Sequence, residues 1–197
     1  MDKIFEGFLA HQYQEGIALA EASDLLELEP LHESPPQHYL ARFYCKGLTR
    51  SQDGCICEAN RFEVGLWFPS DYLRHVNSLF IVTWLNPREI FHPNISNTAP
   101  IMCLGPITPG TPLTDLLYRS FELITWNKLT MRENEALNAE ACVWARHNPD
   151  RYPVDRRPLK RRKENFNGGK QACSSGMDEI HMTEEQTREN HQDRHPS

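Results

Sequence analysis

The sequence has no long apolar run, and this absence argues against two classes of protein. Every window long enough to span a membrane is interrupted by charged residues, so we expect no transmembrane helix and no membrane partner. The first 20 residues include Asp2, Glu6 and Glu15 and lack the apolar core of a secretory signal peptide. We therefore expect an intracellular, cytoplasmic protein.

The sequence also lacks the patterns that are typical of metal and cofactor sites. Six cysteines are present, but without a secretory signal we expect reduced thiols rather than disulfides. Cys55 and Cys57 have the spacing that places both sulfurs on one face of a strand, yet two further ligands at suitable spacing are missing. We interpret the pair as half-buried strand cysteines and predict neither a metal nor a cofactor.

Positive charge is scarce in the first 150 residues, which hold 11 lysines and arginines against 19 aspartates and glutamates. Such an acidic body does not suit nucleic acid as a main ligand, so we expect no nucleic-acid partner. The exception is the basic run from Arg156 to Lys163, which could bind anions or serve as a nuclear address. A solvated junction between a domain and its tail is the commoner role for such a run.

Apolar periodicity is lost from about Arg156 onward. The end of the sequence is polar, contains Gly and Ser, and is nearly free of aromatic residues. A segment of this composition cannot bury enough apolar surface to offset the entropy that it loses on ordering. We predict a folded domain at 1–159 and a disordered polar tail with a basic start at 160–197.

The first half of the domain changes from a helical to an extended pattern. A rough apolar stripe predicts a helix from Asp2 to about Leu28, with an acidic exposed side and Pro30 at its end. Extended runs then predict three antiparallel strands at 38–46, 55–68 and 79–84, with an Asp-Gly turn between the first two.

Helical spacing returns in the second half. Thr111 is the expected N-cap and Pro112 the first helical residue of a helix with a buried face. That face comprises Leu113, Leu116, Leu117, Phe121 and Ile124. A last helix is expected from Glu135 to His147, with Leu137, Ala141, Trp144 and Ala145 facing inward. The predicted fold class is α+β, in which an N-terminal helix and C-terminal helices accompany an antiparallel β-meander.

The loop between the last strand and these helices, FHPNISNTAPIMCLGPITPG at 91–110, concentrates the chemistry of the sequence. Pro93 and Pro100 restrict the residues before them to extended geometry, and this stiffens the segment. His92 and Asn94 add polar side chains that can hydrogen-bond within the loop. Cys103 follows Asn94 closely enough for one folded loop to bring the two together.

This loop and its surroundings resemble those of ubiquitin-conjugating enzymes, the UBC family. Phe68-Pro69-Ser70-Asp71-Tyr72 precedes His92-Pro93-Asn94, which precedes Cys103-Leu104, and the order of elements is similar over residues 2–159. The resemblance implies that Cys103 accepts a ubiquitin-like modifier as a thioester from an activating-enzyme-like protein and transfers it to an amine. The implied partners are the modifier, the activating enzyme and a ligase or target protein.

The resemblance also implies roles for residues near Cys103. Asn94 would be an oxyanion-side carboxamide, although a loop-bracing hydrogen bond explains the residue equally well. Glu135 would orient or deprotonate the incoming amine, unless it is a helix N-terminal carboxylate without a function. His92 and Pro93 are expected to be structural, since a catalytic-base role for His92 is the less favoured interpretation.

Several features depart from the family pattern. Tyr72 is followed by Leu73-Arg74-His75 instead of a proline pair, the Trp-Ser-Pro expected after the cysteine is missing, and the first helix is acidic. An acidic helix predicts a basic groove on the activating enzyme. These traits are more similar to the divergent prokaryotic branch. Two alternatives stay open: a catalytically silent relative that binds or scaffolds a ubiquitin-like modifier, and a cysteine hydrolase that uses Cys103 with a histidine such as His92.

Overall fold

The structure is a computed structural model that describes residues 2–32 and 34–161. The chain divides into two units, Met1–Lys163 and Glu164–Ser197, and every described residue belongs to the first. The predicted disordered tail falls almost entirely outside the described residues. Within the described part of the chain, no helix combines the length and the apolar character needed to cross a membrane.

The N-terminal helix α1 (Lys3–Glu21) is shorter than predicted. Asp2 caps it, because its Oδ1 accepts a hydrogen bond from Ile4 N at 3.0 Å. The predicted extension to Leu28 is wrong, since Leu26–Leu31 forms strand β1. Burial alternates residue by residue at the start of β1, and a strand rather than a helix has this period.

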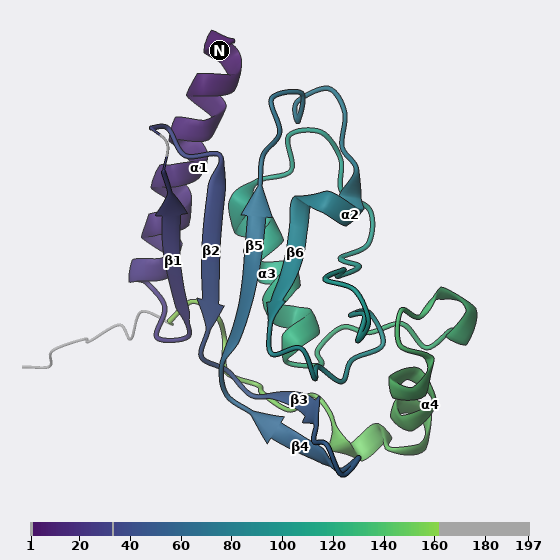
Figure 1. The fold of residues 1–197 in the computed structure, drawn as a ribbon. Coiled ribbons are helices and arrows are strands. Elements are labelled where there is room, and N and C mark those ends of the chain that lie inside the picture. The colour runs from purple at the N-terminus through teal and green to yellow at the C-terminus, as the bar shows by residue number, and fades with distance from the viewer. Residues whose placement is uncertain (1, 33, 162–197) are drawn as a thin grey trace, which may run out of the picture. The chain divides into compact units, whose positions relative to one another are not determined.

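Four antiparallel strands form the main sheet in the order β1-β2-β5-β6 (Figure 1). β2 (His38–Phe43) pairs with β1 and with β5 (Phe62–Trp67), and β5 pairs with β6 (Val82–Asn86). The meander therefore has four strands rather than three. The strand predicted at 79–84 begins later because Ser78–Ile81 forms a short helix, α2.

A separate hairpin, β3 (Gly47–Arg50) and β4 (Ile56–Ala59), interrupts the path from β2 to β5. Gly54 has a φ of +85°, which suits the glycine of the predicted Asp-Gly turn. Cys55 and Cys57 are exposed, so the prediction of half-buried cysteines is wrong. The cause is that β4 lies at the edge of a two-stranded sheet instead of within the main one.

Helix α3 (Leu113–Ile124) has the predicted buried face, and it lies with α1 on one side of the main sheet (Figure 1). Its start differs from the prediction. Pro112 is the N-cap and Thr111 hydrogen-bonds back to Thr108 O instead of capping the helix. The Leu113 N–H donates to Oε1 of Gln12 on α1 at 2.7 Å, so a tertiary contact replaces the local cap.

The last helix, α4 (Ala139–His147), begins later than predicted. Asn138 is its N-cap and accepts a hydrogen bond from Ala141 N at 3.1 Å. Glu133–Glu135 forms a 3-10 turn, η1, in place of the first helical turn, and Leu137 is exposed rather than packed inward. A second 3-10 turn, η2 (Pro149–Arg151), follows α4.

The apolar side chains form two clusters. The main core lies between the sheet and helices α1 and α3, and it includes Met102 and Leu104 from the cysteine loop. The second cluster joins the β3–β4 hairpin, the segment before the His-Pro-Asn triplet, and α4. Its buried members are Leu48, Phe91, Trp126, Ala141 and Ala145. Both cores therefore contribute to the support of the loop that carries Cys103.

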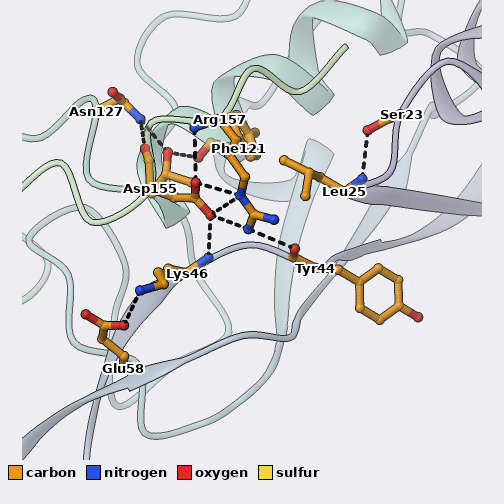
Figure 2. Close-up of polar contacts among 10 residues, drawn as sticks. Ser23, Leu25, Tyr44, Lys46, Glu58, Phe121, Asn127, Asp155 and Arg157 are labelled. Atoms are coloured by element: carbon orange, nitrogen blue, oxygen red, sulfur yellow. Dashed lines mark hydrogen bonds and ion pairs between the residues drawn. The ribbon is translucent and has the colours of Figure 1, made fainter. Parts of the chain in front are cut away.

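The last described residues, 152–161, form a segment that we call the C-terminal strap. Asp155 is buried, and its Oδ2 accepts hydrogen bonds from Lys46 N at 2.9 Å and Arg157 Nη2 at 2.6 Å (Figure 2). Burial disfavours its charged form, but these hydrogen bonds together outweigh burial and lower the pKa of Asp155 to about 2. Leu159 is 2% exposed within the main core, and Arg161 N donates to Ala22 O at 2.9 Å. The described basic side chains of the run, at 156, 157, 160 and 161, are exposed, while Leu159 anchors the segment to the domain.

Candidate active site

Cys103 lies between two residues that face the main core. Met102 is 0% exposed and Leu104 is 3% exposed, whereas Cys103 has intermediate exposure. Successive side chains of an extended backbone point to opposite sides, so burial of both neighbours turns the Cys103 side chain toward the surface. Cys45 and Cys142, in contrast, are buried. Cys103 thus combines a fixed backbone with a reachable sulfur.

Backbone pairing holds the cysteine loop against the edge of the main sheet. Thr83 of β6 forms an antiparallel bridge with Ile101. Within the loop, Ile95 pairs with Met102 in a second antiparallel bridge, and Cys103 N donates to Asn94 O at 2.8 Å. Residues 94–103 are therefore a narrow loop whose two arms are paired to each other and, on one side, to β6.

The Asn94 side chain joins the cysteine to a second loop, 127–138. Its Oδ1 accepts a hydrogen bond from Thr130 N at 2.7 Å. Its Nδ2 donates to Cys103 O at 3.4 Å, which is long for a hydrogen bond. The carboxamide therefore braces the loop, as one of the two sequence interpretations requires. Because Nδ2 carries two hydrogens, one N–H lacks a partner among the described residues and stays available to a substrate.

His92 is fully buried, and its Nδ1 accepts a hydrogen bond from Asn94 N at 3.0 Å. Burial lowers the pKa of His92 to about 3, against a smaller opposing effect of the Lys128 backbone. The ring is therefore neutral at physiological pH. A buried imidazole whose Nδ1 already holds the loop is poorly placed to take a proton from Cys103, and this geometry favours the structural interpretation of His92.

Pro93 and Glu135 show how the loop before α4 is placed. Pro93 O accepts hydrogen bonds from Leu137 N at 2.8 Å and Asn138 N at 3.2 Å, which ties this loop to the His-Pro-Asn triplet. Glu135 is exposed in η1 and pairs with Arg132, with 2.9 Å between Oε1 and Nη1. Within the described residues, neither a hydrogen bond nor an ion pair links Glu135 to Cys103 or Asn94.

Trp126 supports the site in a way that the sequence did not reveal. Its ring meets that of His92 at 4.8 Å between centroids and 73° between planes, and it also packs against Phe91 and Trp144. Trp126 Nε1 and His92 Nε2 are buried and lack hydrogen-bond partners in the described part of the chain. The Lys128 backbone, which opposes the effect of burial on the pKa of His92, is not such a partner. The edge-to-face arrangement offers a weak N–H···π contact instead. Trp126 follows the end of α3, where sequence spacing carries no signal for such a contact.

Comparison with models of known protein families gives no match, and neither does a search of curated proteins. Among the described residues, no group of three or more His, Cys, Asp or Glu side chains is arranged to hold a metal ion. The chemistry of the site must therefore be inferred from Cys103 and its neighbours.

Proposed function

We propose that the chain is a ubiquitin-conjugating-type acyltransferase with a UBC-like fold. The observation that carries the proposal is the setting of Cys103, a partly exposed thiol on a loop that is fixed to the sheet and paired with Asn94. A carrier of another polypeptide needs a sulfur that is reachable and yet held in one place. The order of α1, antiparallel sheet, cysteine loop, α3 and α4 agrees with the family resemblance.

The proposed reaction has two acyl transfers. The Cys103 thiolate attacks the thioester carbonyl that joins the modifier's C-terminal glycine to the activating enzyme, which has consumed ATP to form it. A new C–S bond forms and the activating enzyme's thiolate leaves. An amine nitrogen of the acceptor then attacks the same carbon, a C–N bond forms, Cys103 leaves as a thiolate, and the amine loses a proton to solvent or a nearby carboxylate.

The residue type at position 103 suits this chemistry. A thioester keeps acyl-transfer potential that an oxygen ester largely loses, so a serine carrier would react slowly with amines. A cysteine thiol is on the order of a few per cent ionised near neutral pH, and the first transfer therefore needs no dedicated base. The buried, neutral His92 argues against the alternative of a hydrolase with a Cys103–His92 pair.

The neighbouring residues receive distinct roles in this proposal. The free N–H of Asn94 Nδ2 stabilises the oxyanion that forms at the thioester carbonyl, while Oδ1 keeps the carboxamide in place through Thr130 N. Glu135 breaks its ion pair with Arg132 and then accepts the proton of the incoming amine. His92 and Pro93 hold the loop. The exposed Glu6, Glu15 and Glu21 make α1 acidic, which favours a basic groove on the activating enzyme.

Incubation with ubiquitin or another purified ubiquitin-like protein, its activating enzyme and ATP tests the proposal on a non-reducing gel. We expect an adduct that thiols cleave, that Cys103→Ala abolishes, and that becomes thiol-resistant in Cys103→Ser. Cys57→Ala is the control because Cys57 is more exposed than Cys103 and would also react with a non-specific acyl donor. Binding of the modifier without an adduct would instead support a catalytically silent scaffold, and cleavage of a preformed conjugate would support a hydrolase.

A further inference from the structure

A pocket of about 270 Å³, to which both polar and apolar residues contribute, opens beside the His-Pro-Asn triplet. The end of β3, the segment that follows β6, and the N-terminus of α4 form its walls. The polar lining residues that matter here are Arg50, Gln52, Arg88, Glu89, Asn97 and Asn138. The hydrogen bond from Asn138 N to Pro93 O places one wall of the pocket directly beside the residue that precedes Asn94.

Asn138 points to a ligand for this pocket. The residue is only 6% exposed, and its Oδ1 is occupied as the cap of α4. Its Nδ2 has no hydrogen-bond partner among the described residues, yet it is not one of the polar atoms sealed from solvent. The two N–H groups of Nδ2 are therefore unpaired and in contact with solvent, and Asn138 itself lines the pocket. They lie at the positive end of the α4 helix dipole, which favours an anionic acceptor.

Arg88 supplies the charge that Asn138 lacks. It is exposed, and within the described residues its guanidinium has neither an ion pair nor a hydrogen bond. Arg50 does not add a second free charge, because Glu140 and Gly54 O occupy its guanidinium. Glu89 also lines the pocket and opposes a doubly charged ligand more than a singly charged one. One free arginine beside one glutamate suits a singly charged carboxylate better than a doubly charged phosphate.

We propose that this pocket binds the carboxylate of an aspartate or glutamate in an acidic segment of the acceptor protein, and so positions the acceptor amine near Cys103. The proposal rests on the proposed function and adds a specificity site to it. A second pocket of about 310 Å³ shares Arg88 and Asn97 with the first and is also lined by Leu85 and Pro100. An extended peptide therefore has room on both sides of Arg88, and each pocket offers both polar and apolar contacts.

Binding of fluorescent lysine peptides to the full chain, without modifier or ATP, tests the pocket independently of catalysis. We expect a peptide with glutamate near the lysine to bind about tenfold more tightly than its glutamine counterpart, and Arg88→Gln to remove that difference. Arg156→Gln is the matched control because it removes the same charge from another exposed arginine that has neither an ion pair nor a hydrogen bond among the described residues. Equal binding of the two peptides, or tighter binding of a phosphoserine peptide, would overturn the carboxylate assignment.

Transfer from loaded Cys103 to the same peptides separates this proposal from the proposed function. Faster transfer to the glutamate peptide, lost in Arg88→Gln with loading unchanged, supports both. Selective binding without any thioester on Cys103 supports a carboxylate pocket but overturns its role in acceptor selection. Loading and transfer with no preference between the peptides would leave the conjugating function in place and overturn the pocket proposal.

Discussion

Asn94 and Cys103 are joined in both directions: Cys103 N donates to Asn94 O at 2.8 Å, and Asn94 Nδ2 reaches back to Cys103 O at 3.4 Å. The same side chain accepts from Thr130 N at 2.7 Å. One carboxamide therefore fixes the position of the thiol relative to two loops. The shorter bracing contact, to Thr130 N, is made by Oδ1, whereas the proposed catalytic role belongs to Nδ2, so substitutions can separate the two.

Asn94→Ala should still load the modifier but discharge it slowly. Loss of a donor that meets developing charge slows such a step by about 100-fold or more. Loss of the Thr130 N–H acceptor should also lower the unfolding free energy by about 1 kcal/mol. Asn94→Asp keeps an oxygen for Thr130 N but not the donor, so we expect slow discharge with better-preserved stability. Single-turnover discharge and urea unfolding measure the two effects, and a well-folded Asn94→Asp that discharges normally would exclude the oxyanion role.

The burial of His92 predicts a loss of stability in mild acid. Its pKa is about 3 in the folded chain and about 6.5 in the unfolded chain. As the pH falls, the unfolded state binds the proton first. The stability that the neutral, buried His92 contributes is therefore fully present above about pH 6.5 and declines toward pH 3. The decline approaches 1.4 kcal/mol per pH unit.

Urea unfolding between about pH 7 and 5 measures this slope, because the stability that Asp155 contributes is lost only below about pH 5. His92→Asn is the control, since it cannot titrate in this range but retains an oxygen that can accept from Asn94 N. We expect a flatter profile for this variant. Identical slopes in both proteins would show that another group causes the acid sensitivity.

Thiol labelling should rank the described cysteines by their surroundings. Cys55 and Cys57 are exposed and should react fastest with N-ethylmaleimide, followed by Cys103. Cys45 and Cys142 should be protected, because both are buried and burial raises the pKa of Cys142 and raises that of Cys45 to about 12. Mass spectrometry of timed digests gives the order. Protection of Cys103 to the level of Cys45 would mean that its sulfur is out of reach of any acyl donor.

Glu135 offers a test of the amine-side role. Glu135→Gln should slow discharge to amines without changing loading, whereas Arg132→Gln should leave discharge unchanged or faster because it frees the carboxylate. Both residues are exposed, so each substitution should have little effect on stability. Equal discharge rates in wild type and Glu135→Gln would assign Glu135 to the loop surface alone.

The C-terminal strap should contribute to stability, unlike the chain beyond it. Leu159→Ala should cost about 2–5 kcal/mol. Asp155→Asn should cost about 1–3 kcal/mol, because the Lys46 N–H and Arg157 lose their charged acceptor. Arg156→Gln is the surface control and should change the unfolding free energy by no more than about 0.5 kcal/mol.

Deletion of residues 164–197 should leave the melting temperature and Cys103 loading intact, and a large drop in either would show that those residues support the domain.

Sequence patterns predicted the α+β class and the buried face of α3, because helical spacing over three turns is a strong local signal. They missed β1, whose LELEPL run follows α1 so closely that its leucines also fit a helical stripe. They also missed the start of α3, since the N–H that Thr111 was expected to cap is bound by Gln12 from a distant helix. Errors therefore fall where a tertiary contact decides the local structure.

In the candidate site, too, local motifs could be predicted from the sequence and distant contacts could not. The triplet, its prolines and Cys103 were visible as a motif, and the structure places Asn94 and Cys103 in contact. The partners that decide their roles were not visible, since Thr130 and Trp126 come from a loop and a helix end with no spacing signal. The pocket around Arg88 and Asn138 was equally hidden, because residues from three separate segments line it.

Cys103 lies between residues that belong to the two apolar clusters. Its neighbours Met102 and Leu104 are anchored in the main core, while Phe91 and Trp126, on the His92 side of the loop, belong to the second cluster. A partner that binds α4 or the β3–β4 hairpin therefore contacts the cluster that packs against His92, whose Nδ1 accepts from Asn94 N beside Cys103.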